Sequence, residues 1–152
     1  MKIRKLGNEG LNVSAIGFGA MSITGFFGPT DDKTSQKCLA SAYDNGIDFF
    51  DTADVYGSGS SEKLIGQFLK ETKAKIKIAT KSGIQTEPIR QFNNSNEYLS
   101  DSLDKSLHRL GVDYVDLFYI HRREASRPIE EVVETLTGFI KSGKIGGYGL
   151  SE

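Results

Sequence analysis

Cysteine, proline and tryptophan are scarce in this chain, whose 152 residues include one cysteine, three prolines and no tryptophan. The single cysteine, Cys38, cannot form an internal disulfide, and this fits a reducing compartment. No apolar run approaches the length of a membrane span. The basic start, residues 1–5, is not followed by an apolar stretch, so we expect no signal peptide and a cytoplasmic location.

An excess of charge is also missing. Nineteen lysines and arginines against twenty aspartates and glutamates give a net charge of −1. This balance argues against nucleic acid or an anionic membrane as the main partner. The hydrophobic share of 38% is ordinary for a soluble domain, and no composition shift marks a boundary. We therefore expect a single domain over residues 1–152 with a core of its own.

The sequence does contain a regular alternation of apolar runs and helical stripes. Residues 1–16 hold two strand-like pieces around a glycine-containing turn, which predicts a β-hairpin. Further strands are predicted at 16–21, 47–50, 75–79, 114–120 and 145–150. Helices are predicted between them, beginning at Asp31 or Asp32, at Ser60 or Ser61, near Asn94 and at Pro128. Cys38 lies along the first helical stripe, so we expect it to be a small core residue.

Strands that alternate with helices predict an α/β fold with a parallel sheet and crossover helices. Chemistry in such folds gathers where the strands end, at the carboxyl edge of the sheet. Three consecutive strands lead to Asp51, Lys81 and His121, and Tyr56 lies on the loop after the first of them. A lone polar residue at a strand end is usually a cap or a solvated charge, but three in succession favour a catalytic site.

Carbonyl reduction is the chemistry that needs this set of side chains. Hydride addition to a carbonyl carbon leaves an alkoxide, which must receive a proton. A tyrosine can supply it, but a phenol with an ordinary pKa of about 10 is a poor acid at neutral pH unless an ammonium lies close by. We therefore predict Tyr56 as the proton donor, Lys81 as its electrostatic activator and Asp51 as the ion-pair partner that holds Lys81. His121 would orient the substrate by a hydrogen bond to the carbonyl oxygen.

Two other interpretations of these segments, a Schiff-base lysine and a dinucleotide-binding fingerprint, agree less well with the sequence. A Schiff-base role for Lys81, as in aldolase-type barrels, needs a neutral amine, whereas a facing Asp51 carboxylate would hold the lysine protonated. The dinucleotide fingerprint at 17–22 lacks its third glycine and is not followed by a helix. No metal is expected in the site. Arg122 and Arg123 are either a solvated edge or flank the pocket mouth, and the sequence leaves both options open.

Segments around this site resemble the signature regions of the aldo-keto reductases. The similar segments are Asp51–Gly57 (DTADVYG), Ser61–Gly66 (SEKLIG), Ala79–Lys81 (ATK), Arg109–Leu117 (RLGVDYVDL) and Gly149–Glu152 (GLSE). The opening is similar as well, at Arg4–Gly7 and Ile16–Gly19. The subtype resembles microbial members that carry Gly28–Asp32 and His121-Arg122. The resemblance covers essentially the whole chain.

This resemblance implies a (β/α)8 barrel of the TIM type with an N-terminal hairpin at 1–16. It implies NADPH-dependent reduction of an aldehyde or ketone, with a small-molecule carbonyl substrate as partner. It carries the catalytic residues of the family onto Asp51, Tyr56, Lys81 and His121. The cofactor-binding residues that it implies are Gly19, Ala20, Met21, Asp51, Ser151 and Glu152.

The length of the chain departs from the family pattern. A complete barrel of this kind needs about 250 residues or more, so we expect an incomplete barrel of about four βα units plus a fifth strand. In the family, later loops hold the adenosine and 2′-phosphate of NADPH. Unpaired sheet edges would favour self-association or a complementing half-barrel. The alternative function is a catalytically incompetent half-barrel, acting as a binding or regulatory module as in potassium-channel β subunits, or a truncated remnant.

Overall fold

The computed structural model of the chain describes residues 1–7 and 10–151. The chain begins with an antiparallel hairpin, in which β1 (Ile3–Lys5) pairs with β2 (Asn12–Ser14). The hairpin agrees with the prediction, although part of its turn, residues 8–9, lies outside the described residues. Ser14 N donates to Asp48 Oδ1 at 2.7 Å, which joins the hairpin to the start of the main sheet.

Five parallel strands form the main sheet. They are β3 (Phe18–Gly19), β4 (Phe49–Asp51), β5 (Lys77–Ser82), β8 (Val115–Ile120) and β9 (Ile145–Leu150). Neighbouring strands follow one another in chain order across the sheet. This order is typical of a (β/α) barrel, whereas a doubly wound sheet reverses its order at a switch point.

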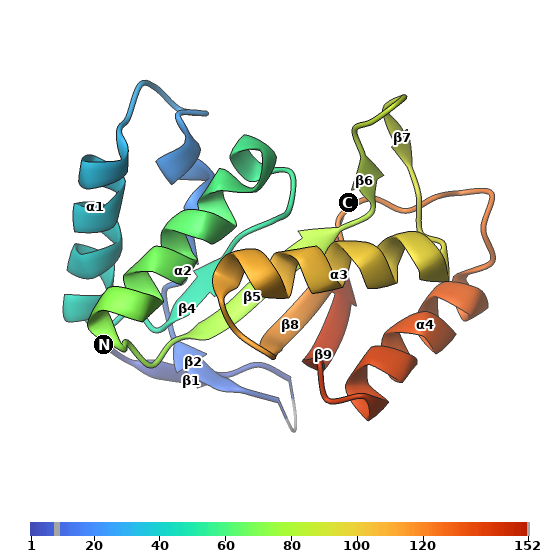
Figure 1. The fold of residues 1–152 in the computed structure, drawn as a ribbon. Helices are drawn as coiled ribbons and strands as arrows, with labels where there is room; N and C mark the ends of the chain where they lie inside the picture. Colours follow the sequence, from blue (N-terminus) through green and yellow to red (C-terminus); the bar gives the residue numbers. More distant parts are fainter. Residues whose placement is uncertain (8–9, 152) are drawn as a thin grey trace.

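Four α-helices cross between these strands and cover one face of the sheet (Figure 1). They are α1 (Asp32–Asp44), α2 (Ser60–Thr72), α3 (Asn96–Leu110) and α4 (Ile129–Lys141). Helix α1 begins where the sequence predicted, because the Asp31 carboxylate accepts a hydrogen bond from Thr34 N at 2.6 Å. Helices confined to one face correspond to the outer layer of a barrel wall.

The core lies between the helices and the sheet. Phe50 of β4 and Phe118 of β8 are fully buried, and Phe50 stacks on Phe68 of α2 with ring centroids 6.1 Å apart. The other helices contribute fully buried leucines, Leu39, Leu103 and Leu136. On the opposite face of the sheet, side chains such as Phe49 and Tyr119 are only half-buried. The helices and this single core therefore hold the strand ends in fixed positions.

Two side chains differ from the sequence-based expectations. Cys38 is exposed, because the buried face of α1 is centred on Ser35 and Leu39. One residue along a helix turns the side chain by about 100°, and this turn carries Cys38 toward solvent. Helix α3 is capped by Ser95 and not by Asn94, since the Ser95 hydroxyl accepts the hydrogen bond from Tyr98 N at 3.3 Å.

A second hairpin between β5 and α3 was not predicted. Its strands are β6 (Ile84–Gln85) and β7 (Gln91–Phe92). Neither of these two-residue strands lies in an apolar run or an alternation from which a strand is predicted. At the next predicted boundary, Pro128 caps α4 and does not belong to its first turn. No helix of the described residues is long and apolar enough to cross a membrane.

Candidate active site

The carboxyl edge of the sheet brings the predicted catalytic residues together. Asp51 is the last residue of β4, Lys81 lies near the end of β5, and His121 directly follows β8. These three strands are parallel neighbours, so their ends meet at one edge. Tyr56 opens the 3-10 helix η2 (Tyr56–Gly59) on the loop after β4.

Lys81 makes the contacts that join this group. Its side chain is 10% exposed, and Nζ donates to Asp51 Oδ1 at 2.5 Å and to the Thr52 carbonyl oxygen at 2.8 Å. A third contact reaches the Tyr56 hydroxyl at 3.3 Å. An ion pair with a carboxylate stabilises the ammonium form, and this argues against a Schiff-base role for Lys81.

The backbone turns sharply directly after Tyr56. Gly57 has a φ of 55° and Ser58 a φ of 52°, both in the left-handed region. A Cβ added at Gly57 would lie 2.1 Å from Ser60 Oγ and 3.0 Å from Thr24 Cβ, so glycine avoids two contacts and suits the positive φ. The turn leaves Lys81 Nζ 4.9 Å from the centroid of the Tyr56 ring, within cation–π distance.

His121 completes the group from the third strand. Its ring lies edge-on to Tyr56, with centroids 5.7 Å apart and an interplanar angle of 81°. His121 is 8% exposed, and its Nδ1 has no hydrogen-bond partner among the described residues. Burial lowers the pKa of His121 to about 4, and the charges of Lys81 and Arg122 add to the shift. The imidazole is therefore neutral at pH 7, with one N–H available to a carbonyl oxygen.

A buried polar network lies on the helix side of β5. Glu62 of α2 is fully buried; it accepts a hydrogen bond from Thr80 Oγ1 at 2.6 Å and pairs with Arg109 of α3 at 2.6 Å. Because Thr80 precedes Lys81, this network fixes two helices to the strand that carries Lys81. From the sequence, Glu62 and Arg109 stood out only through the family resemblance, since partners 47 residues apart form no local pattern.

The predicted cofactor residues lie on both sides of the four predicted catalytic residues. On one side, at the end of β3 and the start of the 3-10 helix η1 (Ala20–Thr24), are Gly19, Ala20 and Met21. On the other side Ser151 follows β9, whereas Glu152 lies outside the described residues. A Cβ added at Gly19 would meet no atom within 4 Å. Open space therefore adjoins the catalytic group at the end of β3.

Arg122 lies at the rim of this site. Its Nη1 donates to the His121 carbonyl oxygen at 2.7 Å and to Ser151 Oγ at 3.4 Å. These contacts bridge the ends of β8 and β9, and Arg122 is half-buried there. Arg123, by contrast, is exposed.

Asp54 is a half-buried residue that no sequence pattern indicated, and its Oδ1 is shielded from solvent. By distance and angle, neither this atom nor Ser82 Oγ has a hydrogen-bond partner among the described residues. Burial raises the pKa of Asp54 to about 6, and the Glu62 carboxylate adds to the rise. A cavity of about 300 Å³ adjoins Asp54, and its lining includes Tyr98, Lys105 and Arg109 but none of the four predicted catalytic residues. No local pattern could have revealed this burial, which depends on packing by α2 and α3.

The sequence is similar to one known protein family over most of its length. The model of the Aldo/keto reductase family matches residues 15–152. The chain belongs to the aldo/keto reductase family. An aldo-keto reductase of Schizosaccharomyces pombe, whose name includes NADP(+), is 40% identical over 154 residues that cover 98% of this chain. The chain spans 45% of the length of that relative.

Solved reductase structures show the same fold. An aldo-keto reductase of Bacillus halodurans in its holo form has a TM-score of 0.89 and 34% identity, covering 99% of this chain and 50% of that one. The glycerol dehydrogenase of Gluconobacter oxydans has a TM-score of 0.85 and 30% identity, covering 97% of this chain and 47% of that one. The described residues thus form the hairpin, four βα units and fifth strand of a (β/α)8 barrel.

Proposed function

We propose that this site reduces an aldehyde or ketone to an alcohol with NADPH as the hydride donor. The contact that carries the proposal is made by Lys81 Nζ, which bonds to both Asp51 and the Tyr56 hydroxyl. The Lys81 ammonium, which is paired with Asp51, therefore lies beside the Tyr56 hydroxyl that must release a proton. Family membership supports the reaction type, and the NADP(+) in the name of the S. pombe relative supports the cofactor.

The chain's own residues supply the proton and the orientation. When bound, NADPH supplies a hydride to the carbonyl carbon, and the C=O bonding pair moves to the oxygen. Tyr56 gives its hydroxyl proton to that oxygen, which leaves an alcohol and a phenolate stabilised by Lys81. The neutral His121 donates a hydrogen bond that orients the carbonyl oxygen. Solvent then returns a proton to Tyr56.

The nicotinamide end of the cofactor fits the residues that flank the catalytic group. The proposed binding residues are Gly19, Ala20, Met21, Asp51, Ser151 and Glu152. Two observations support this set: the open space at Gly19, and the Ser151 hydroxyl, which can donate to a carboxamide oxygen while it accepts from Arg122.

The loop after η1 is a candidate wall of the substrate pocket. Phe26 and Phe27 are 69% and 72% exposed, and their rings pack edge-to-face 5.0 Å apart. Exposed aromatic side chains on a loop at the catalytic edge suit an apolar portion of a substrate. Because one structural neighbour is a glycerol dehydrogenase, alcohol oxidation should be assayed beside carbonyl reduction.

NADPH titration followed by turnover of small aldehydes and ketones tests this proposal. Tyr56→Phe removes the proton donor, and Tyr114→Phe is the matched control because it removes a 43% exposed phenol just before β8. We expect carbonyl-dependent NADPH consumption to be lost in Tyr56→Phe and kept in Tyr114→Phe. NADPH binding without turnover would support the alternative of a binding or regulatory module. Absence of both binding and turnover would contradict the proposal.

We also propose a cytoplasmic location and a small-molecule partner. A single cysteine fits the cytoplasm, and a net charge of −1 fits a small-molecule partner better than nucleic acid or a membrane. The possible protein partners are a second copy of this chain and a complementing half-barrel, because β3 and β9 each have one neighbour in the described sheet.

A further inference from the structure

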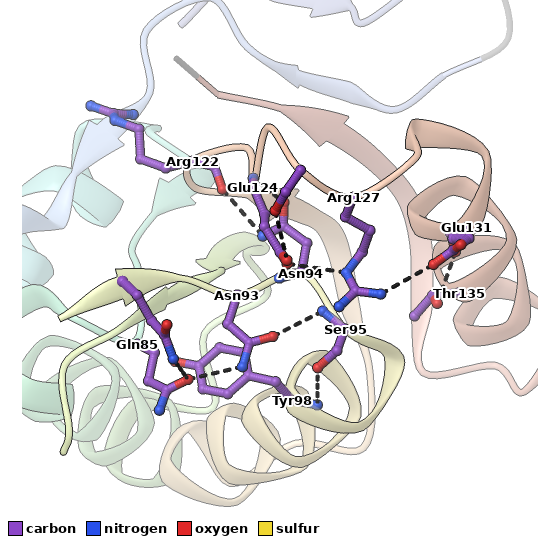
Figure 2. A network of polar contacts seen from close by, with 12 residues as sticks. Gln85, Asn93, Asn94, Ser95, Tyr98, Arg122, Glu124, Arg127, Glu131 and Thr135 are labelled. Carbon is purple, nitrogen blue, oxygen red and sulfur yellow. Dashed lines mark hydrogen bonds and ion pairs between the residues drawn. The ribbon is translucent and has the colours of Figure 1, made fainter. Parts of the chain in front are cut away.

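Asn94 joins two loops at the catalytic edge. It lies between β7 and α3 and is 1% exposed. Its Oδ1 accepts a hydrogen bond from Glu124 N at 2.8 Å, and its Nδ2 donates to the Arg122 carbonyl oxygen at 3.2 Å. Figure 2 shows this amide between the loop before α3 and the loop after β8. One side chain thus satisfies backbone groups on both sides of Arg123.

Glu124 extends this anchor to the next helix. Asn94 N donates to Glu124 Oε2 at 2.8 Å, and Arg127 Nε donates to the same oxygen at 3.0 Å. The hydrogen bond from Asn94 N, with Arg127 beside it, holds the pKa of Glu124 below its usual range. Arg127 also bonds to Glu131 of α4 at 3.1 Å (Figure 2). The loop after His121 is therefore fixed at both of its ends.

Gly83 makes room for the Asn94 amide. It has a φ of 117°, and a Cβ added there would lie 2.7 Å from Asn94 Nδ2. Gly83 directly follows β5, and the carbonyl oxygen of Ser82 before it accepts a hydrogen bond from His121 N at 2.7 Å. The ends of β5 and β8, which carry Lys81 and His121, are therefore hydrogen-bonded to each other beside the Asn94 amide.

His121 is buried against Tyr56, but no side-chain hydrogen bond fixes its Nδ1 among the described residues. A functional imidazole is usually oriented by a hydrogen bond at one ring nitrogen, but His121 Nδ1 has no partner among the described residues. The ring position then follows from the backbone that carries it. We propose that Asn94 is a positioning residue, whose amide fixes the loop at 121–124 and thereby sets the His121 imidazole against Tyr56. The inference rests on the role proposed for His121.

Asn94→Ala tests this inference without adding a charge near the imidazole. The matched control is Asn93→Ala, which removes an amide that bonds to Gln85 Oε1 at 2.8 Å and to Ser95 N at 3.0 Å (Figure 2). Exchange of the histidine C2 hydrogen, followed by mass spectrometry across a range of pH, gives the titration midpoint of His121. We expect this midpoint to rise by about one pH unit or more in Asn94→Ala, as the released imidazole gains solvent. It should stay near 4 in Asn93→Ala.

An unchanged His121 midpoint in folded Asn94→Ala would overturn the inference, because a merely structural residue would lower stability without moving it. If Asn94→Ala does not fold, amide exchange in the unmodified chain decides. The Glu124 amide should be protected at least as well as the Arg127 amide, which donates to the Glu124 carbonyl oxygen at 3.1 Å. Exchange of Glu124 at the rate of an exposed loop would be the contrary result. Neither readout uses turnover, so failure of the proposed reaction would be seen separately.

Discussion

Asp54 is a buried carboxyl group on the same loop as Tyr56, and it makes the stability of the chain depend on pH. Burial raises its pKa from 3.8 to about 6, and the Glu62 carboxylate adds to the rise. The folded chain therefore holds this proton more tightly than the unfolded chain. The resulting stability is fully present below about pH 4 and is lost as the pH rises through 6.

Asp54→Asn should consequently stabilise the chain at pH 8 but not at pH 4. A rise in pKa of this size corresponds to about 3 kcal/mol, which is the gain we expect in the free energy of unfolding at pH 8. Urea unfolding at the two pH values measures it. Asp113→Asn, at an exposed position, is the control and should stay within about 0.5 kcal/mol at both. A gain of the same size at both pH values would show that Asp54 is not the titrating group.

Lys81→Met tests the role of the ammonium. The substitution removes the positive charge beside the Tyr56 hydroxyl but keeps a side chain of similar length. We therefore expect kcat to fall by about 100-fold or more. Adding Asp51→Asn should lower kcat at saturating NADPH little further, because Asp51 acts on the proton donor through Lys81. Lys77→Met is the matched control, since Lys77 lies on the same strand and pairs with Asp48. Equal losses in Lys77→Met and Lys81→Met would contradict the assignment.

Single residues were predictable where a local pattern placed them. Asp51, Lys81 and His121 could be predicted because each lies at the end of an apolar run in a parallel α/β pattern. Asn94 could not, since its spacing from Glu97 imitates a capping box, whereas its side-chain partners lie 28 and 30 residues further along the chain. Contacts at that separation depend on how the loops meet, which no local pattern records.

Among the elements, α2 and α3 are joined by the buried ion pair of Glu62 and Arg109. Arg109→Met would leave a fully buried carboxylate without its partner, so we expect a loss of about 3–5 kcal/mol in the free energy of unfolding. Adding Glu62→Gln should recover part of that loss. Arg123→Met, at an exposed position, is the control for removal of a guanidinium. Urea unfolding measures all three variants, and a loss below about 1 kcal/mol in Arg109→Met would contradict the account.

Elements with an apolar run or a helical stripe were predictable, whereas the short hairpin of β6 and β7 was not. The helices show apolar residues at helical spacing, with a capping Asp31 before α1 and a left-handed Gly111 after α3. Strand β5 extends to Ser82, beyond the predicted end at residue 79. The prediction stopped early because Thr80–Ser82 are polar, although the fold buries them. Burial of polar residues at a strand end is the property that a catalytic edge requires and that hydrophobic patterning misses.

The whole sheet has two open edges in the described residues, because β3 and β9 each pair with one neighbour. On β9 the apolar side chains Tyr148 and Leu150 are 38% and 51% exposed. Unpaired backbone groups and exposed apolar side chains favour pairing with another sheet. We therefore expect the 152-residue chain by itself to self-associate, with a mass in solution above 16.7 kDa.

Leu150→Lys should weaken this association, because a charge on an edge strand opposes further pairing. Ile89→Lys is the control: Ile89 is 73% exposed but lies in the connection between β6 and β7. Sedimentation at several concentrations measures both variants. A monodisperse monomer of the unmodified chain that unfolds cooperatively would contradict the expectation.

At this scale the architecture could be predicted, since strand–helix alternation indicates a parallel sheet and the family resemblance indicates a barrel. The comparisons confirm the barrel, and the chain spans about half or less of the reductases that it matches. Association could be inferred only as a consequence of open edges, because composition and net charge do not specify a partner.

The central claim is that Tyr56 completes a hydride transfer to a carbonyl. It is tested most directly with NADPH deuterated at the transferred position and an aldehyde, by mass analysis of the alcohol product. We predict one deuterium on the carbinol carbon with the unmodified chain and with Tyr114→Phe, and a rate lower by about 100-fold or more with Tyr56→Phe. An alcohol without the label, or product formed by Tyr56→Phe at the unmodified rate, would contradict the account.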